Sequence, residues 1–154
     1  MDVRDFLSPD SIVLDLASAN KKQVLQALSQ RIAPLARLDE RIVFDVILER
    51  ERLGTTGIGK GIAIPHGKIA SLERIHGLFA RLKPPVDFEA LDGEPVDLVF
   101  VLLAPAAAGA DHLKALAWVS KLLRDPVECE KLRKAPDAKR VFAILTSEAA
   151  NRAA

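Results

Sequence analysis

One histidine of this chain stands where the local sequence could expose it for chemistry. His66 lies in the run Ile64-Pro65-His66-Gly67, directly after a short apolar segment. Proline has no amide hydrogen to give to a sheet and glycine accepts unusual backbone angles, so we expect the strand to break here and the imidazole to project from the end of the sheet. A neutral imidazole is nucleophilic at pH 7. His66 is therefore a candidate nucleophile, with a purely structural histidine as the alternative.

A cation on the preceding helix could assist this histidine. Arg50 lies three residues after Ile47 and seven after Val43, which places it on the apolar stripe of a predicted helix, in the last turn. A guanidinium there requires an anionic partner or must reach water. Two interpretations are open: an ordinary salt bridge, or a clamp on the oxygens of a phosphoryl group carried by His66, for which the planar guanidinium is suited.

Two further histidines differ in their setting. His112 opens a predicted helix, where it could cap the helix or lie exposed, and could equally donate a hydrogen bond to a phosphoryl oxygen. His76 precedes a strand with no partner visible in the sequence, and we expect it to be structural or exposed. The spacing of the three histidines matches no local metal-binding pattern, so we expect no metal and no cofactor.

The glycine-rich segment 54–61 matches most of a nucleotide-binding phosphate loop, G-x-x-x-x-G-K-[ST]. Its last position is Gly61, so the hydroxyl that would hold Mg²⁺ is missing. The segment also follows a helix and precedes a strand, whereas a phosphate loop precedes its helix. We therefore predict no nucleotide site, but a loop whose backbone passes close to the reacting side chain. Four residues are expected to support the phosphoryl site in this way: Thr56, Gly57, Gly59 and Gly67.

Composition excludes several classes of protein. The 154 residues carry 22 Lys+Arg and 21 Asp+Glu, a net charge of +1, which argues against a nucleic-acid binder that works by general basicity. No stretch approaches the roughly 20 apolar residues of a membrane helix, and no signal-like apolar core follows the N-terminus, so we expect a cytoplasmic protein without membrane insertion. The single cysteine, Cys129, lies between acids that would raise its pKa, which makes it a poor nucleophile.

Helices interspersed with short strands predict an α/β fold, a single-domain sandwich with a mixed sheet between helical layers. We predict strands over 12–16, 62–64, 77–82 and 96–103, the last buried on both faces. We predict helices over 21–36 (ended or kinked near Ala33 by Pro34), 40–53, 111–124 with Asp111 as its cap, 126–134, and a helix or strand-helix segment from Asp137. One domain should span 1–154, with 147–154 a frayed tail.

These motifs together resemble one protein family. The run 50–68, RERLGTTGIGKGIAIPHGK, resembles the active-site signature of enzyme IIA of the fructose/mannitol class of the bacterial phosphotransferase system, and is most similar to its nitrogen-regulatory branch. Segments 91–100 and 111–122 also resemble that family, so the likeness covers nearly the whole chain.

The resemblance implies a fold and a function. It implies a mixed sheet of about five strands, and a phosphoryl group that His66 accepts at Nε2 from a histidine-containing phosphocarrier protein, assisted by Arg50 and His112. In the regulatory branch, the phosphorylation state controls binding to target proteins. Lys60 stands where other residues are common in the family, which would alter docking. Two alternatives stay open: a sugar-specific IIA that passes phosphate to a permease, and a non-enzymatic partner-binding module.

Overall fold

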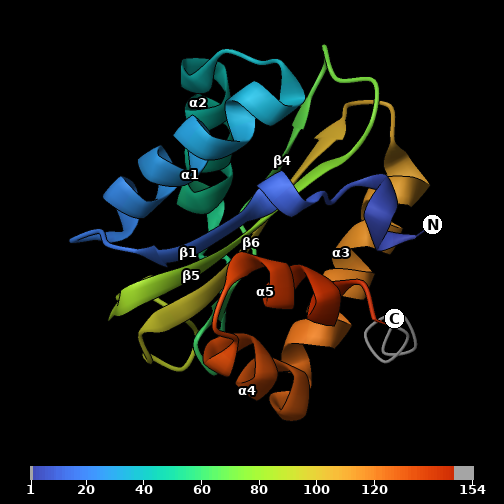
Figure 1. Ribbon diagram of the computed structural model, residues 1–154. Coiled ribbons are helices and arrows are strands. Elements are labelled where there is room, and N and C mark those ends of the chain that lie inside the picture. The colour runs from blue at the N-terminus through green and yellow to red at the C-terminus, as the bar shows by residue number, and fades with distance from the viewer. Residues whose placement is uncertain (1, 148–154) are drawn as a thin grey trace.

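The computed structural model describes residues 2–147 and contains an open, mixed sheet of six strands (Figure 1). The strand order is β1-β5-β6-β3-β2, and β4 also pairs with β6. Neighbours β5/β6 and β2/β3 are antiparallel, whereas β1/β5, β3/β6 and β4/β6 are parallel. The strands are β1 (Ile12–Leu16), β2 (Gly57–Gly59), β3 (Ile62–Ala63), β4 (His66–Ile69), β5 (His76–Val86) and β6 (Val96–Pro105). The predicted α/β sandwich is confirmed, with six strands instead of about five.

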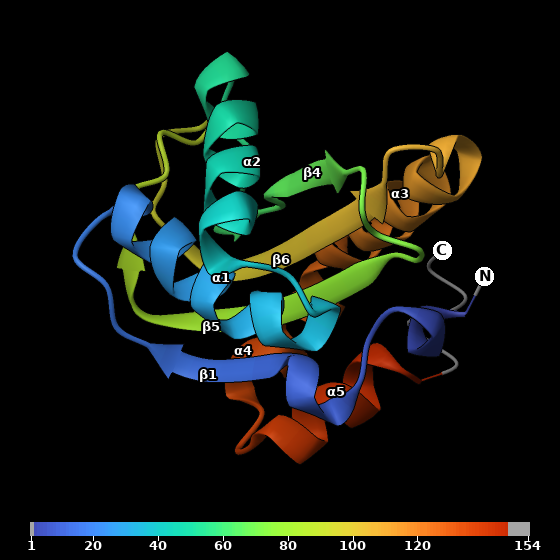
Figure 2. The ribbon, with the colours of Figure 1, turned by 90° about the horizontal axis from the view of Figure 1, so that it is seen from above.

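Helices form a layer on each face of the sheet. Helices α1 and α2 lie on one face, and α3, α4 and α5 lie on the other (Figure 2). Two short 3₁₀ turns, Val3–Asp5 and Pro9–Ser11, precede β1. The α-helices are α1 (Lys21–Ala36), α2 (Glu40–Leu53), α3 (Gly109–Arg124), α4 (Pro126–Lys134) and α5 (Ala138–Leu145).

Strand β6 is the buried centre of the sheet, as its unbroken apolar sequence predicts. Successive side chains of a strand point to opposite faces, so β6 contributes to two cores. Leu98 and Phe100 pack in the cluster that α3, α4 and α5 complete. Val99 and Val101 pack in the cluster that α1 and α2 complete. Because both phases of β6 are buried, this strand packs against the helices on both faces of the sheet.

The first two helices begin where the sequence predicts. Asn20 caps α1 and Asp39 caps α2, each through its side-chain oxygen. Of the two predicted effects of Pro34, an end or a kink near Ala33, the end is wrong, because α1 continues through Pro34 to Ala36. A proline in the last turn leaves only one helical hydrogen bond unmade. The helix ends at Ala36, and the following residue, Arg37, caps it in the left-handed conformation.

The glycine-rich segment is partly a hairpin and not simply a loop. Residues Gly57–Gly59 form β2, which pairs antiparallel with β3. Lys60 and Gly61 make the turn with φ of 56° and 83°, values that glycine adopts readily and lysine only at a cost. The amide of Lys60 donates to a carboxylate oxygen of Asp92 at 2.8 Å, which fixes the turn.

Two further boundaries differ from the prediction. Strand β5 runs through Pro84 and Pro85 to Val86, because its register with β6 shifts between Arg81 and Val86 and no ladder donor is needed there. Helix α3 begins at Gly109, so Asp111 lies in its first turn and does not cap it.

The remaining C-terminal elements follow the prediction. Asp125 caps α4, with Pro126 in its first turn, and Asp137 caps α5. Of the predicted frayed tail, 147–154, all but Ser147 lies outside the described residues. In residues 2–147, no helix combines the length and the apolar character needed to cross a bilayer.

Candidate active site

His66 is the first residue of β4, which pairs in parallel with β6. Strands β3 and β4 both pair in parallel with β6, and Ile64-Pro65 separates them. The Pro65 carbonyl accepts a hydrogen bond from the Leu102 amide at 3.0 Å, so the chain stays beside β6 across the interruption. The expected break is present, but the ring does not project beyond the end of the sheet, because a new strand starts at His66. The imidazole is partly buried.

The two ring nitrogens of His66 have different partners. Nδ1 lies 2.9 Å from the carbonyl oxygen of Ile64, and Nε2 lies 3.3 Å from Nε of Arg50. A carbonyl oxygen can only accept and a guanidinium can only donate, so Nδ1 carries the proton and Nε2 carries the lone pair. The backbone therefore selects the tautomer in which the lone pair lies on Nε2.

Arg50 lies in the last turn of α2, as its spacing predicts, and points to the histidine. Its Nη1 donates to the carbonyl oxygen of Gly54 at 2.9 Å, and its Nε donates to His66. No carboxylate of residues 2–147 forms an ion pair with it, so the ordinary salt bridge is not what the structure contains. A partly exposed guanidinium without an anion is available for one.

His112 is buried and lies beside His66. The ring centroids are 5.9 Å apart, and the side chain comes from the first turn of α3. The alternatives of an exposed residue or a helix cap are both wrong, because α3 starts early enough to turn this residue inward. Among the described residues Nδ1 of His112 has no hydrogen-bond partner. Such a nitrogen could be satisfied by a group added nearby.

The four predicted supporting residues divide into two groups. Gly67 lies against Val46 of α2, one turn before Arg50, and this close approach brings the arginine to the histidine. Thr56 is buried and bonds the Glu51 carboxylate through both its amide and its hydroxyl. Gly57 and Gly59 lie elsewhere: an added Cβ would be 3.0 Å from Ala90 and 3.1 Å from Asp92, respectively. They support the hairpin and not the histidine directly.

Comparisons with known proteins identify the family. Residues 5–148 match the family model described as phosphoenolpyruvate-dependent sugar phosphotransferase system, EIIA 2. The chain belongs to this family. The IIA chain is 54% identical over 145 residues to a nitrogen regulatory protein of Bradyrhizobium diazoefficiens, covering 94% of this chain and 95% of the relative.

Two other similar proteins come from the nitrogen-regulatory and the sugar-specific members of this family. The crystal structure of nitrogen regulatory protein IIA-Ntr from Neisseria meningitidis superposes with a TM-score of 0.89 at 36% identity, covering 94% of this chain and 99% of that one. A fructose-specific EIIA component of Haloferax volcanii is 37% identical over 149 residues, covering 94% and 97% of the two chains. The chain is thus nitrogen-regulatory-like, within a family that also contains sugar-specific members.

Sequence reasoning missed two residues of this IIA site. Glu51 is buried, and its carboxylate lies 2.8 Å from Nζ of Lys21 at the start of α1. The signal for Glu51 was present, since it lies four residues after Ile47 and eight after Val43, on the buried stripe of α2. Lys21 gave no such signal, because its partner is 30 residues away in sequence and only the packing of α1 on α2 joins them.

The IIA chain holds its histidines in the neutral form. Burial lowers the pKa of His66 below 6.5; the hydrogen bond to Ile64 opposes this and the charge of Arg50 adds to it. Burial also lowers the pKa of His112, and the positive charges of His66, when it is protonated, and of Lys68 lower it further. A neutral imidazole retains the lone pair that nucleophilic attack requires.

We expect His66 to titrate below pH 6.5 when its ring signals are followed by NMR. The Arg50→Ala variant should titrate at a higher pH than the parent, because a neighbouring positive charge is removed. Because the pKa of His66 is lower in the folded chain than in the unfolded one, the unfolded chain binds more protons near pH 6.5. The free energy of unfolding should therefore fall as the pH decreases below about 6.5. A titration midpoint at or above the value of a free histidine would contradict this expectation.

The Gly67→Ala variant should be destabilised by about 1–3 kcal/mol, because its Cβ would overlap Cγ1 of Val46 and force α2 away from β4. Chemical denaturation measures the loss. Gly54→Ala is the matched control, since nothing lies within 4 Å of the added carbon and the backbone there is extended. Equal free energies of unfolding for the two variants would show that α2 can move away from β4 without loss of stability.

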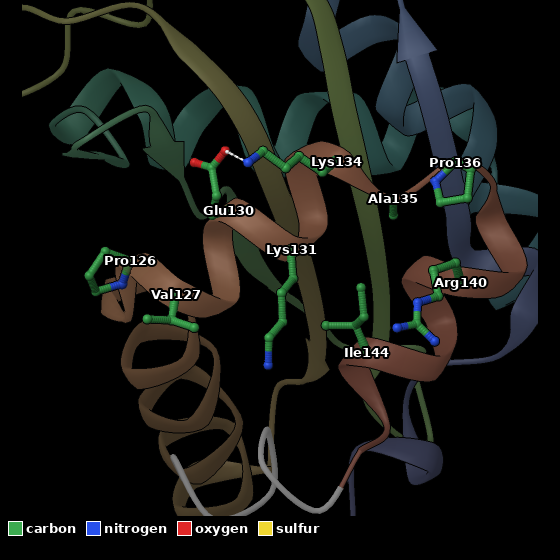
Figure 3. Close-up of a pocket in the computed structure, with 9 residues that line it drawn as sticks. All are labelled: Pro126, Val127, Glu130, Lys131, Lys134, Ala135, Pro136, Arg140 and Ile144. Carbon is green, nitrogen blue, oxygen red and sulfur yellow. Dashed lines mark ion pairs between the residues drawn. The ribbon is translucent and has the colours of Figure 1, made fainter.

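Other features of the IIA chain lie apart from this site. A cavity of about 650 Å³ between α4 and α5 is lined by Lys131, Lys134 and Arg140, and contains none of the site residues (Figure 3). Cys129 is buried, and burial raises the pKa of its thiol to about 11. Its predicted poor reactivity therefore has desolvation as the main cause, with the neighbouring acids contributing less.

Proposed function

We propose that His66 accepts a phosphoryl group at Nε2 from the phosphohistidine of a phosphocarrier protein, and that its phosphorylation state controls binding to target proteins. The observation that carries this proposal is the arrangement at one imidazole: the Ile64 carbonyl holds the proton on Nδ1, while Nε2 faces an arginine that lacks an anion. Membership of the EIIA 2 family and the similarity to nitrogen regulatory proteins support it.

The transfer needs no proton to leave the ring. Nε2 of His66 attacks the phosphorus in line, and its bond to phosphorus forms as the donor's nitrogen–phosphorus bond breaks. The proton stays on Nδ1, where the Ile64 carbonyl stabilises the positive charge that the phosphorylated ring acquires. Arg50 moves its Nε–H from the ring nitrogen to a phosphoryl oxygen, and His112 donates to another. Positioning and charge stabilisation supply the catalysis.

A change of charge at this site would alter the binding of a partner that docks beside it. Leu53, 85% exposed, precedes the Gly54 carbonyl that holds Arg50, and Leu113, 67% exposed, follows His112. The site is thus flanked by apolar side chains that a partner could cover. A phosphoryl group adds about −1.5 to −2 charges beside them at pH 7, which would favour one set of partners and repel another.

A sugar-specific IIA is the second candidate, favoured by the likeness to a fructose-specific EIIA component. Both candidates predict the same phosphohistidine, but they differ in the fate of its phosphoryl group. A sugar-specific IIA would pass the group rapidly to a IIB domain of a permease, whereas a regulator would retain it and change its affinity for a target.

Incubation with phosphoenolpyruvate, enzyme I and a histidine phosphocarrier tests the proposal. One phosphoryl group per chain should appear as an acid-labile phosphoramidate in phosphorus NMR. Absence of that signal would leave the non-enzymatic partner-binding module as the better interpretation. Affinity for candidate targets, compared between the two phosphorylation states, then separates regulation from sugar transport.

A further inference from the structure

The last turn of α2 contains a buried acid to which the transfer mechanism assigns no part. The Glu51 side chain is 3% exposed, although it adjoins the partly exposed Arg50. One oxygen accepts from the Thr56 amide at 2.8 Å, and the other accepts from the Thr56 hydroxyl at 2.6 Å. Lys21 lies 2.8 Å from the first oxygen. A buried carboxylate satisfied in this way is strongly held, and removing any one partner leaves a buried charge less fully compensated.

These contacts fix the turn that leaves α2. Glu51 and Thr56 are its two ends, and Gly54 lies between them with its carbonyl oxygen 2.9 Å from Nη1 of Arg50. The same turn is anchored on its far side, where the Thr55 hydroxyl donates to the Phe88 carbonyl at 2.7 Å. The position of the Gly54 carbonyl, and with it the direction of the guanidinium, therefore depends on the Glu51–Thr56 contacts.

Glu51 is placed so that it does not compete for the arginine. Successive residues of a helix point about 100° apart, so the carboxylate faces α1 while the guanidinium faces β4. Lys21 supplies the positive charge that Glu51 requires. In residues 2–147 the side chain of Arg50 forms hydrogen bonds only with the Gly54 carbonyl and His66 and no ion pair, and so remains available for an anion.

We infer that Glu51 is a positioning residue for phosphoryl transfer: with Thr56 and Lys21 it holds the Gly54 carbonyl where it orients Arg50 toward His66. The inference rests on the proposed function for its kinetic consequence, but the orientation itself exists in the unphosphorylated protein. A displacement near 1 Å of a group that stabilises the transition state is sufficient to slow a reaction severely.

The Glu51→Gln variant tests this role, because the amide nitrogen it introduces can no longer accept a bond from Thr56. We expect its maximal rate of phosphorylation to fall about 10- to 100-fold, with the phosphocarrier concentration that gives half-maximal rate unchanged. Glu49→Gln is the matched control, since Glu49 is exposed on the same helix and, within residues 2–147, pairs only with Arg52. If Glu51→Gln is unstable, Thr56→Val provides a second test. It removes the hydroxyl contact with Glu51 but keeps the amide contact, and it should also lower the rate.

Two readouts separate positioning from a general effect on the fold. In an Arg50→Ala background, Glu51→Gln should slow transfer by less than twofold, because its effect acts through the arginine. In the unphosphorylated protein, the NMR signal of the Arg50 Nε–H should shift in Glu51→Gln and not in Glu49→Gln. Fully additive rate losses, or an unshifted signal, would overturn the inference. A wild-type chain that takes no phosphoryl group would overturn the proposed function, while the NMR comparison would still decide the orientation.

Discussion

The His66→Ala variant is expected to take no phosphoryl group at all from a phosphorylated phosphocarrier. The His66 ring is held by a carbonyl at Nδ1 and faces Arg50 with Nε2, an arrangement that neither other histidine has. His112 is buried, and His76 lies at the start of β5 beside Arg74. Removing the imidazole therefore removes the only acceptor nitrogen with an arginine bonded to it, among the described residues. Phosphorus NMR and incorporation of labelled phosphate measure the loss.

His76→Ala is the matched control for this experiment, because it removes an imidazole of similar exposure and leaves the site intact. It should retain the full extent of labelling. The His66→Ala chain should keep its circular dichroism spectrum, since the side chain is only partly buried. Label that persists in His66→Ala would place the acceptor on another residue and end the proposed mechanism.

The Arg50→Ala variant should be phosphorylated about 100- to 1,000-fold more slowly than the wild type, the usual loss when one preorganised donor to a developing charge is removed. The guanidinium already lies 3.3 Å from the ring nitrogen that would bond phosphorus, so it needs little movement to reach a phosphoryl oxygen. Single-turnover transfer from the phosphocarrier, followed by rapid quench, measures the rate of the transfer step itself.

The neighbouring arginine provides the control. Arg52 lies on the same helix, is exposed and pairs with Glu49, so Arg52→Ala should transfer at nearly the wild-type rate. Arg50→Lys should recover part of the loss, because an ammonium supplies the charge without the planar pair of donors. Wild-type kinetics in Arg50→Ala would reduce the arginine to a structural link between the Gly54 carbonyl and the ring.

The sequence by itself was sufficient for most of the architecture. Helical spacing, the caps Asn20 and Asp39, and the apolar run of β6 depend on interactions between near neighbours or on burial of whole segments, and these leave a periodic pattern. The same spacing located Arg50 on the inner stripe of α2. Boundaries were less predictable where a tertiary contact replaces a local rule, as where β5 continues through Pro84 because the register with β6 shifts there.

The site itself could be predicted only in part from the sequence. Its motif indicated His66 and Arg50 but not the pairing of Glu51 with Lys21, and the resemblance to enzyme IIA came from that motif. The motif did not distinguish Gly67, which permits the approach of α2 to β4, from Gly59, which faces Asp92 in the hairpin. Both are glycines in the same segment, and what each backbone meets depends on a residue distant in sequence.

Sequence thus determined the family, the fold class and the residues able to do the chemistry, because these depend on side-chain type and short-range spacing. Tertiary structure decided which nitrogen of His66 carries the lone pair, that His112 is buried beside it, and that Glu51 pairs with Lys21. Some of these are contacts between residues far apart in the chain, whose spacing leaves no periodic pattern in the sequence. The others are hydrogen bonds whose geometry exists only once β4, α2 and α3 have packed on β6.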